Sequence, residues 1–198
     1  DFNISQEFLG LRQLFAKAGL ETDWNNKLKT TYRFSYLDFK DYYKGFKNEI
    51  TSNFITDKDE WSAQVNHLNT QATDQDSKYL RFNTEGKRKI AKEIYIGTRF
   101  YGENNELNIH ENQLKSPLSF KFNEFQIKGG WADSIGRKID VTLYTRKDDS
   151  IRLNNWVHMQ NSKGIIFNSQ LIQKADHQLT FNFHYRKVNY EYENSPNE

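Results

Sequence analysis

Residues 177–193 read HQLTFNFHYRKVNYEYE, and this stretch decides how the second half of the chain is interpreted. Apolar residues occupy every second position from Leu179 to Tyr185, as a strand with one buried face requires. After Arg186 and Lys187 the apolar residues move to the other parity. One extra residue in a ladder, a β-bulge, produces such a change and bends the strand. The stretch therefore predicts a bulged strand in a strongly curved sheet.

The same alternation extends back to about residue 79. A second change of parity, at Asn123–Glu124, predicts a second bulge, and residues 102–106 (GENNE) predict a hairpin turn. The connections between the alternating segments are short, which favours antiparallel pairing. We therefore expect residues 79–193 to form an antiparallel β meander that arches.

The first 70 residues predict mainly helix. Segments 3–19, 38–50 and 57–68 place apolar residues three or four positions apart, and each begins with Asn or Asp, which are good helix N-caps. Residues 30–36 are rich in β-branched and aromatic residues and predict one short strand. Residues 69–78 are polar without periodicity and predict a surface loop between the two parts.

Together these patterns predict one α+β domain over residues 1–198. The N-terminal helices of residues 1–70 would pack against a strongly curved, mostly antiparallel sheet, with a cone-like shape or as a partly closed barrel. The chain begins at Asp1, which fits a removed leader better than an excised fragment.

Composition restricts the classes of function. The chain has 28 basic and 26 acidic residues, a balance that argues against a globally steered polyanion binder. It has no cysteine, which excludes disulfides, thiolate catalysis and cysteine-bound zinc. Mean hydropathy is −0.93, and no apolar run reaches the length of a helical membrane span, so we expect no transmembrane segment. Aromatic residues make up 15% of the chain and would supply most of the buried area.

No catalytic constellation stands out in the sequence, which leans against an enzyme but leaves the question open, and no cofactor is predicted. The histidines show no metal-ligand spacing, and no metal site is predicted. Glu191 and Glu193 share a strand face, an arrangement that resembles the ExE element of ADP-ribosyltransferase-like toxins. The arginine strand and the Ser-Thr-Ser element of those toxins are missing, so we treat the match as chance. A carrier with an apolar cavity under the curved sheet stays open as another hypothesis.

The leading hypothesis is a non-catalytic binding or assembly module that holds a partner protein or a glycan. Aromatic and amide side chains on the curved sheet would provide the contacts, as they do at many binding surfaces. Candidate ligand-binding residues are Trp131, Trp156, Tyr144 and Asn155. We expect an exported or surface-associated microbial protein, at the cell surface or outside the cell, while a cytoplasmic location stays open.

The alternative hypothesis is a nucleic-acid-binding or nuclease domain. The segment GKRKIAK, residues 86–92, holds four cations within seven positions, a density that suits phosphate contacts. The candidate residues are Lys87, Arg88, Lys89, Lys92 and Arg99. The same lysines are also typical of an exposed edge strand, where charge blocks aggregation. The sequence does not fix the oligomeric state.

Overall fold

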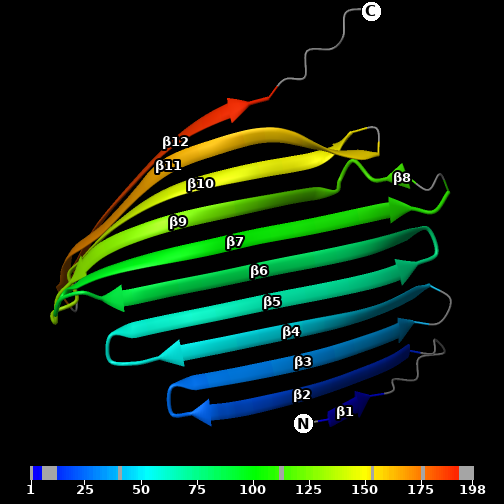
Figure 1. Cartoon of the computed structure of the whole chain (residues 1–198), viewed down its shortest axis with the longest axis horizontal. Helices are drawn as coiled ribbons and strands as arrows, with labels where there is room; N and C mark the ends of the chain where they lie inside the picture. The colour runs from blue at the N-terminus through cyan, green and yellow to red at the C-terminus, as the bar shows by residue number, and fades with distance from the viewer. Residues whose placement is uncertain are drawn as a thin grey trace, which may run out of the picture.

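The computed structural model describes residues 2–5, 13–39, 42–111, 114–152, 154–174 and 177–191. These residues form one antiparallel sheet of 12 strands, and no helix occurs among them. Figure 1 shows the strands side by side, almost in chain order. The strands are β1 (Phe2–Ser5), β2 (Gln13–Asn25), β3 (Leu28–Phe39), β4 (Tyr43–Ile55), β5 (Asp59–Ala72), β6 (Gln75–Lys89), β7 (Ile94–Ile109), β8 (Leu114–Lys115), β9 (Phe120–Ala132), β10 (Lys138–Arg152), β11 (Asn155–Lys174) and β12 (His177–Tyr190).

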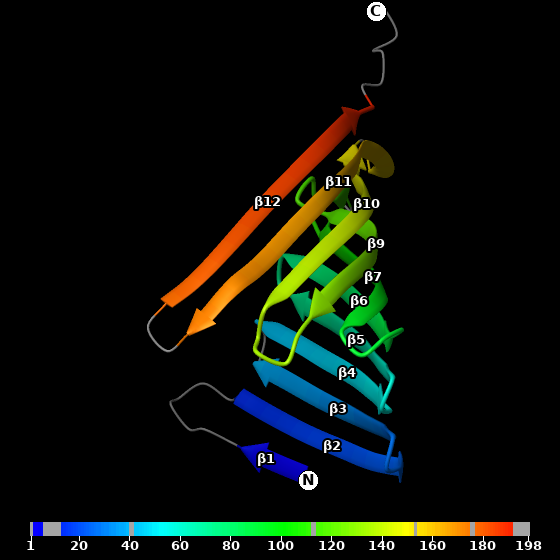
Figure 2. The same cartoon turned by 90° about the vertical axis from the view of Figure 1, so that its left-hand side faces the viewer.

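The sheet is arched but open. Its order is β1-β2-β3-β4-β5-β6-β7-β9-β10-β11-β12, with the short β8 paired to β7 beside this path. Figure 2 shows the sheet bending around one side, with β1 and β12 at separate edges. The α+β prediction is therefore wrong, and so is the partly closed barrel: the described chain is a single antiparallel sheet that does not close.

The expected helices are strands because spacings of four residues are ambiguous. Residues four apart share a face in a helix, but they also share a face in a strand, since four is an even number. Phe46 and Ile50, which predicted helix 38–50, lie on one face of β4. Trp61 and Val65 lie in the same way on β5. Parts of the expected first helix, residues 6–12, and residues 40–41 lie outside the described residues.

The supposed cap before the third helix is a turn. The hydroxyl oxygen of Thr56 accepts hydrogen bonds from the backbone N–H groups of Lys58, at 3.3 Å, and Asp59, at 2.9 Å. Ser and Thr make such bonds in tight turns as readily as at helix N-termini. The turn joins β4 to β5, so the polar residues at 56–59 mark a hairpin instead of a helix start.

Two predicted bulges and one predicted turn are absent where the sequence placed them. Pairing runs without a shift through Asn123–Glu124 and through Arg186–Lys187, and β7 continues through residues 102–106. Register shifts lie instead between Asp23 and Asn25, between Asp148 and Asp149, and between Gln170 and Ile172. Residues 69–78 form a short turn at 73–74 between long strands instead of a loop.

The parity changes mark the end of an apolar stretch. Lys187 lies on the same face as Tyr185, and Asn123 lies on the same face as Phe125, because the pairing stays in register. Lys187 follows Tyr185 by two residues and Asn123 precedes Phe125 by two residues, in each case where the apolar stretch of that face ends. Val188 belongs to the opposite face. The sequence pattern was real, but it reports a boundary on the surface and not a kink in the strand.

Very little of this sheet is buried. The buried hydrophobic residues among those described are Tyr95, Phe122, Tyr144 and Ile151. The chain exposes 14496 Å² of surface, whereas a compact monomer of its mass exposes roughly 9,800 Å². A single layer without a covering layer has no ordinary hydrophobic core. The chain therefore exposes about half again as much surface as a compact monomer of its mass.

Candidate functional site

The register divides the sheet into two faces of opposite chemistry. Residues paired across neighbouring strands point to the same side, and their immediate neighbours along a strand point to the other side. We call the two sides the apolar face and the polar face. Large side chains of the apolar face include Leu20, Tyr32, Phe34, Ile50, Phe54, Trp61, Val65, Leu80, Phe82, Ile96, Phe100, Phe125, Ile127, Val141, Leu143, Ile165, Phe167, Phe183 and Tyr185.

The apolar face is the exposed one. Ile50 is 45% exposed, Leu143 is 50% exposed and Phe183 is 51% exposed, although all three lie well inside their strands. Along β10 the residues of this face from Val141 to Thr145 are all exposed. Scattered surface hydrophobics are normal, but a continuous apolar surface across a whole sheet marks an interaction with something apolar.

A band without charges crosses this face. On β2, β3 and β4 the band comprises residues 14–22, 28–36 and 46–54, where Asp, Glu, Lys and Arg occur only on the other face. Across the described part of β5–β12 the band continues in the same way. Charged side chains of this face lie at its margins or beyond them, and they include Asp38, Lys44, Asp59, Asp76, Lys78, Arg88, Glu106, Lys121, Lys147, Lys163 and Lys187.

The band runs obliquely across the strands. The row of paired residues through Ala18, at the centre of the band on β2, crosses β7 at Asn104. The row through Phe183, at its centre on β12, crosses β7 at Ile96. This shift is about 26 Å along the strands over about 43 Å across them, from standard rise and strand spacing. The strands are therefore tilted by about 30° from the normal of the band.

The width of the band follows from the same geometry. Residues 28–36 of β3 span about 26 Å along the strand, or about 23 Å along the normal at this tilt. Tryptophans mark one margin. Trp24 and Trp61 are 66% and 51% exposed there, and the indole N–H of Trp131 donates a hydrogen bond to the Glu93 carboxylate at 2.9 Å. Each ring joins an apolar body to a polar tip at the edge of the uncharged zone.

The polar face holds most of the buried side chains. On β10, Asp140, Thr142 and Tyr144 are buried while the residues between them are exposed, an inversion of the usual arrangement in a globular protein. Side chains on the inside of a bend converge and cover one another. The burial therefore indicates that the polar face is the concave side of the arch.

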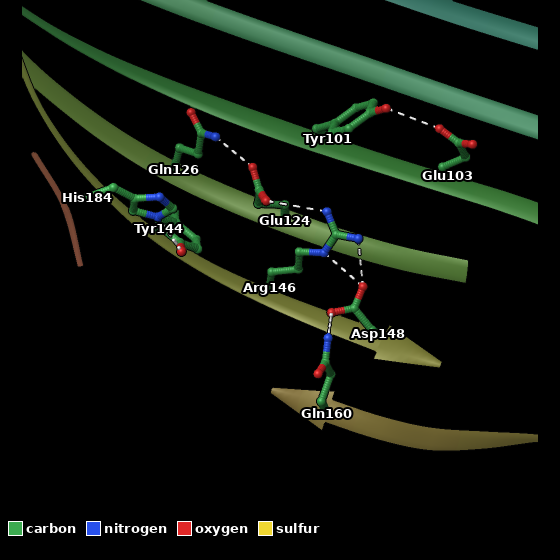
Figure 3. A network of polar contacts seen from close by, with 9 residues as sticks. All are labelled: Tyr101, Glu103, Glu124, Gln126, Tyr144, Arg146, Asp148, Gln160 and His184. Carbon is green, nitrogen blue, oxygen red and sulfur yellow. Dashed lines mark hydrogen bonds and ion pairs between the residues drawn. The ribbon is translucent and has the colours of Figure 1, made fainter. Parts of the chain in front are cut away.

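Ion pairs and hydrogen bonds connect the strands on the polar face (Figure 3). The Arg146 guanidinium lies 2.7 Å from an Asp148 oxygen and 3.8 Å from a Glu124 oxygen, and it stacks on the Phe122 ring at 3.7 Å. Gln160 donates to Asp148 at 3.0 Å. These contacts join β9, β10 and β11. The partners are largely covered, so the loss of one partner would leave a charge without compensation away from water.

A second network connects β6 and β7. Glu103 accepts hydrogen bonds from Arg81 at 3.0 Å and from the Tyr101 hydroxyl at 3.1 Å. Burial raises the pKa of Tyr101, and the hydrogen bond to Glu103 raises it further. Further along the sheet, the Tyr144 hydroxyl lies 2.9 Å from Nε2 of His184 on β12 (Figure 3).

A basic hollow of about 210 Å³ lies on the polar face beside these networks, at residues 95–99 of β7, nearer the start of that strand. Its lining includes Lys87, Tyr95, Gly97, Lys128 and Lys138. Lys87 and Lys128 are the register partners on either side of Gly97, so the missing glycine side chain leaves space between the two lysines. A Cβ at Gly97 would lie 2.8 Å from a backbone carbonyl oxygen, which leaves no room for a side chain.

Burial and mutual repulsion perturb the charges at this hollow. Burial lowers the pKa of the Lys128 ammonium, and the nearby Lys138 and Lys87 ammonium groups lower it further. Burial raises the pKa of the Asp140 carboxyl, and Lys87 opposes this shift. Asp140 lies 2.8 Å from the Lys138 ammonium and 3.9 Å from the Lys128 ammonium. Positively charged side chains are therefore concentrated at this hollow, and the nearby carboxylates neutralise them only in part.

The structure does not bring the four expected ligand-binding residues together. Trp131 and Trp156 pair with β10 at positions 139 and 151, about 40 Å apart along the strand. Asn155 lies beside Trp156 at the start of β11. Tyr144 is buried on the opposite, polar face. Trp156 is covered by cations, with the Lys121 ammonium 4.8 Å from its ring centroid.

The basic residues of the nucleic-acid hypothesis are also divided. Arg88 lies on the apolar face near Asp59, with 3.6 Å between Nε and a carboxylate oxygen. Lys89 ends β6, and Lys92 lies in the turn before β7. Lys87 and Arg99 both line the basic hollow. Only these two residues meet at one site.

The acidic residues of the toxin comparison gather no catalytic partners in the described part. Glu191 lies 3.6 Å from Nε2 of His158, and Glu193 lies outside the described residues. Sequence reasoning missed the main surface feature of the sheet, which is its uncharged face. The available signal was the composition of the two parities: from residue 138 to 148 the even positions carry the charges and the odd positions to 145 carry none.

No helix among the described residues has the length and apolar character to cross a membrane. No protein-family model matches the chain, and no curated protein matches its sequence.

Proposed function

We propose that this chain is a membrane-embedded assembly module. Its apolar face contacts lipid acyl chains, and its polar face bounds a water-filled or protein-filled space. The uncharged, exposed and continuous band of the apolar face carries this proposal. A location in a membrane of the cell envelope agrees with the exported or surface-associated protein expected from the sequence.

Three features of the band support lipid over a protein partner. Its height of about 23 Å is close to the roughly 25 Å apolar band of membrane-spanning strands, and its tilt of about 30° is just below their usual range. Its length of about nine residues per strand agrees with the 9–11 residues that such strands need. Its margin carries tryptophans, which prefer the membrane–water interface.

The polar face supports the same assignment. Charged pairs such as Arg146 with Asp148 lie on the side away from the band, where lipid cannot reach them. In a bilayer the charges of a spanning sheet must face an interior, and its apolar residues must face outward. A soluble two-layer protein would show the reverse, with its apolar face covered by a second layer of the same chain.

The chain offers a direct experiment because it contains no cysteine. Single-cysteine variants Ile50→Cys and Thr51→Cys, each carrying a nitroxide label, place one probe on each face of β4. In lipid vesicles we expect the label at 50 to collide with dissolved oxygen and to be shielded from a water-soluble nickel chelate. The label at 51 should show the opposite preference.

A matched pair at another strand tests whether the pattern belongs to the whole sheet. The second pair of labelled variants is Phe183→Cys, which places the probe on the apolar face of β12, and Asn182→Cys, which places it on the polar face. Equal nickel access at all four positions, or protein that stays in the aqueous fraction when vesicles are sedimented, would reject the proposal.

A further inference from the structure

The basic hollow on the polar face suggests a ligand chemistry that the membrane assignment does not require. We infer that it binds small phosphate-bearing anions, with Lys87, Lys128, Lys138 and Arg99 as the cationic contacts. The inference deepens the proposed function, since it rests on the polar face being open to water or solute.

The charges of the hollow favour an anion. Its lining contains these four cations and two carboxylates, Glu60 and Glu85. In the described part of the chain neither glutamate forms an ion pair within 4.0 Å, although the Glu85 carboxylate opposes the lowering of the pKa of the Lys128 ammonium. Lys87 and Arg99 form no ion pair there either, and Nε of Arg99 donates a hydrogen bond to the Asn83 amide oxygen at 2.7 Å. Asp140 engages Lys138 and, at longer range, Lys128. The cationic side therefore has capacity that the protein's own carboxylates do not use.

The cations converge because of the strand register. Lys87 and Lys128 face each other across Gly97, from β6 and β9. Arg99 lies two residues further along β7, and so on the same face as Gly97. The Tyr95 ring fixes the approach of Lys87, whose ammonium lies 4.3 Å from the ring centroid. An anion between the two lysines would relieve their repulsion.

Phosphate suits this arrangement better than a halide or a single carboxylate. A phosphate group accepts hydrogen bonds in several directions, which matches point-like ammonium groups and a forked guanidinium approaching from different strands. The hollow of about 210 Å³ also holds an anion larger than phosphate itself, since each water molecule occupies only about 30 Å³ of the liquid. Pyrophosphate and small phosphate esters are the ligands that the chemistry selects.

The experiment uses the whole chain in detergent micelles, with inorganic pyrophosphate titrated calorimetrically at two ionic strengths. We expect saturable binding that weakens at the higher salt concentration, because partly exposed charges are screened. Lys87→Gln and Lys128→Gln should each weaken binding about tenfold, the loss of one charge-assisted contact. Lys128→Arg keeps the charge and should restore most of the affinity.

Two further variants make the result specific. Lys47→Gln removes a lysine from the same face, where it pairs with Glu49 at 3.0 Å, and should leave binding unchanged. Asp140→Asn removes the competing carboxylate and should tighten binding. Absence of saturable binding, or equal binding by Lys87→Gln, Lys128→Gln and the unaltered chain, would overturn the inference.

The outcomes also separate this inference from the proposed function. Correct insertion of the labelled variants without pyrophosphate binding would reject the anion site alone. Specific pyrophosphate binding by a chain that does not enter vesicles would reject the membrane assignment and leave the anion site intact.

Discussion

A lysine placed at the centre of the apolar band gives the sharpest test of what covers this face. Leu143 is 50% exposed and lies between its register partners Ile127 and Ile165, which are also exposed. Its row crosses β7 at Thr98. When the centre of the band on each strand is followed along its row of paired residues to β7, it meets Asn104 for β2 and Ile96 for β12. For β10 the corresponding position on β7 lies close to Thr98. Leu143 therefore marks the expected midplane of the bilayer.

The size of the effect depends on the medium. At a bilayer midplane, Lys in place of an apolar residue on a spanning strand costs about 2–4 kcal/mol, and near the interface it costs about 0–1 kcal/mol. On a half-exposed surface in water the same change stays within about 0.5 kcal/mol. Leu143→Lys should thus reduce the folded-to-unfolded ratio about 30-fold or more in lipid.

Leu14→Lys is the matched control. Leu14 is 44% exposed on the same face, but its row crosses β7 at Asn108, four residues from the row of Ala18. That places it about 11 Å from the midplane at a tilt of about 30°. Urea unfolding of both variants from phospholipid vesicles measures the difference. Equal free energies of unfolding for Leu143→Lys, Leu14→Lys and the unaltered chain would refute lipid contact.

Two further predictions concern the polar contacts. Arg146→Met should destabilise the sheet by about 1–3 kcal/mol because it leaves the covered carboxylates of Asp148 and Glu124 without their cation; chemical unfolding measures this, and an unchanged midpoint would contradict it. The backbone carbonyl of Thr73 and the Asp76 carboxylate raise the pKa of His110 above 6.5. The contribution of protonated His110 to the stability of the fold is therefore complete below the pKa of the unfolded state and is lost as pH rises through the pKa of the folded state. Asp76→Asn should lower the pKa of His110 in an NMR titration, and an unshifted curve would count against the contact.

The strands after residue 79 were predictable because alternation there is long and unambiguous. From Ile139 to Leu143 apolar and polar residues alternate without exception, and the region pairs as an antiparallel meander. The first 70 residues were misread for a physical reason. Apolar residues spaced by four, such as Phe46 and Ile50, satisfy both periods, so the decision rests on the residues between them.

The residues between those two positions favour a strand. Lys47 and Glu49 flank Asn48 on β4 and form an ion pair on the polar face, whereas a helix would distribute the three around its surface. The basic hollow was only half visible in the sequence. Lys87 and Arg99 stood out, but Lys128 and Lys138 come from β9 and β10. Only the sheet places Lys128 beside Gly97 and brings Lys138 to the lining of the hollow.

The apolar band extends to both edges of the sheet. Phe181 and Tyr185 are 56% and 55% exposed on β12, so the apolar band is still at full strength where the pairing ends. At the other side Leu14 and Leu20 carry the band to β2, whose outer neighbour β1 has 4 residues. Within lipid each unpaired backbone N–H or C=O group costs several kcal/mol, because no water can replace its partner. A sheet that meets acyl chains across its whole width must therefore pair both edges with further strands. Among the described residues β12 pairs only with β11, so this edge is the one at which such a strand is needed most.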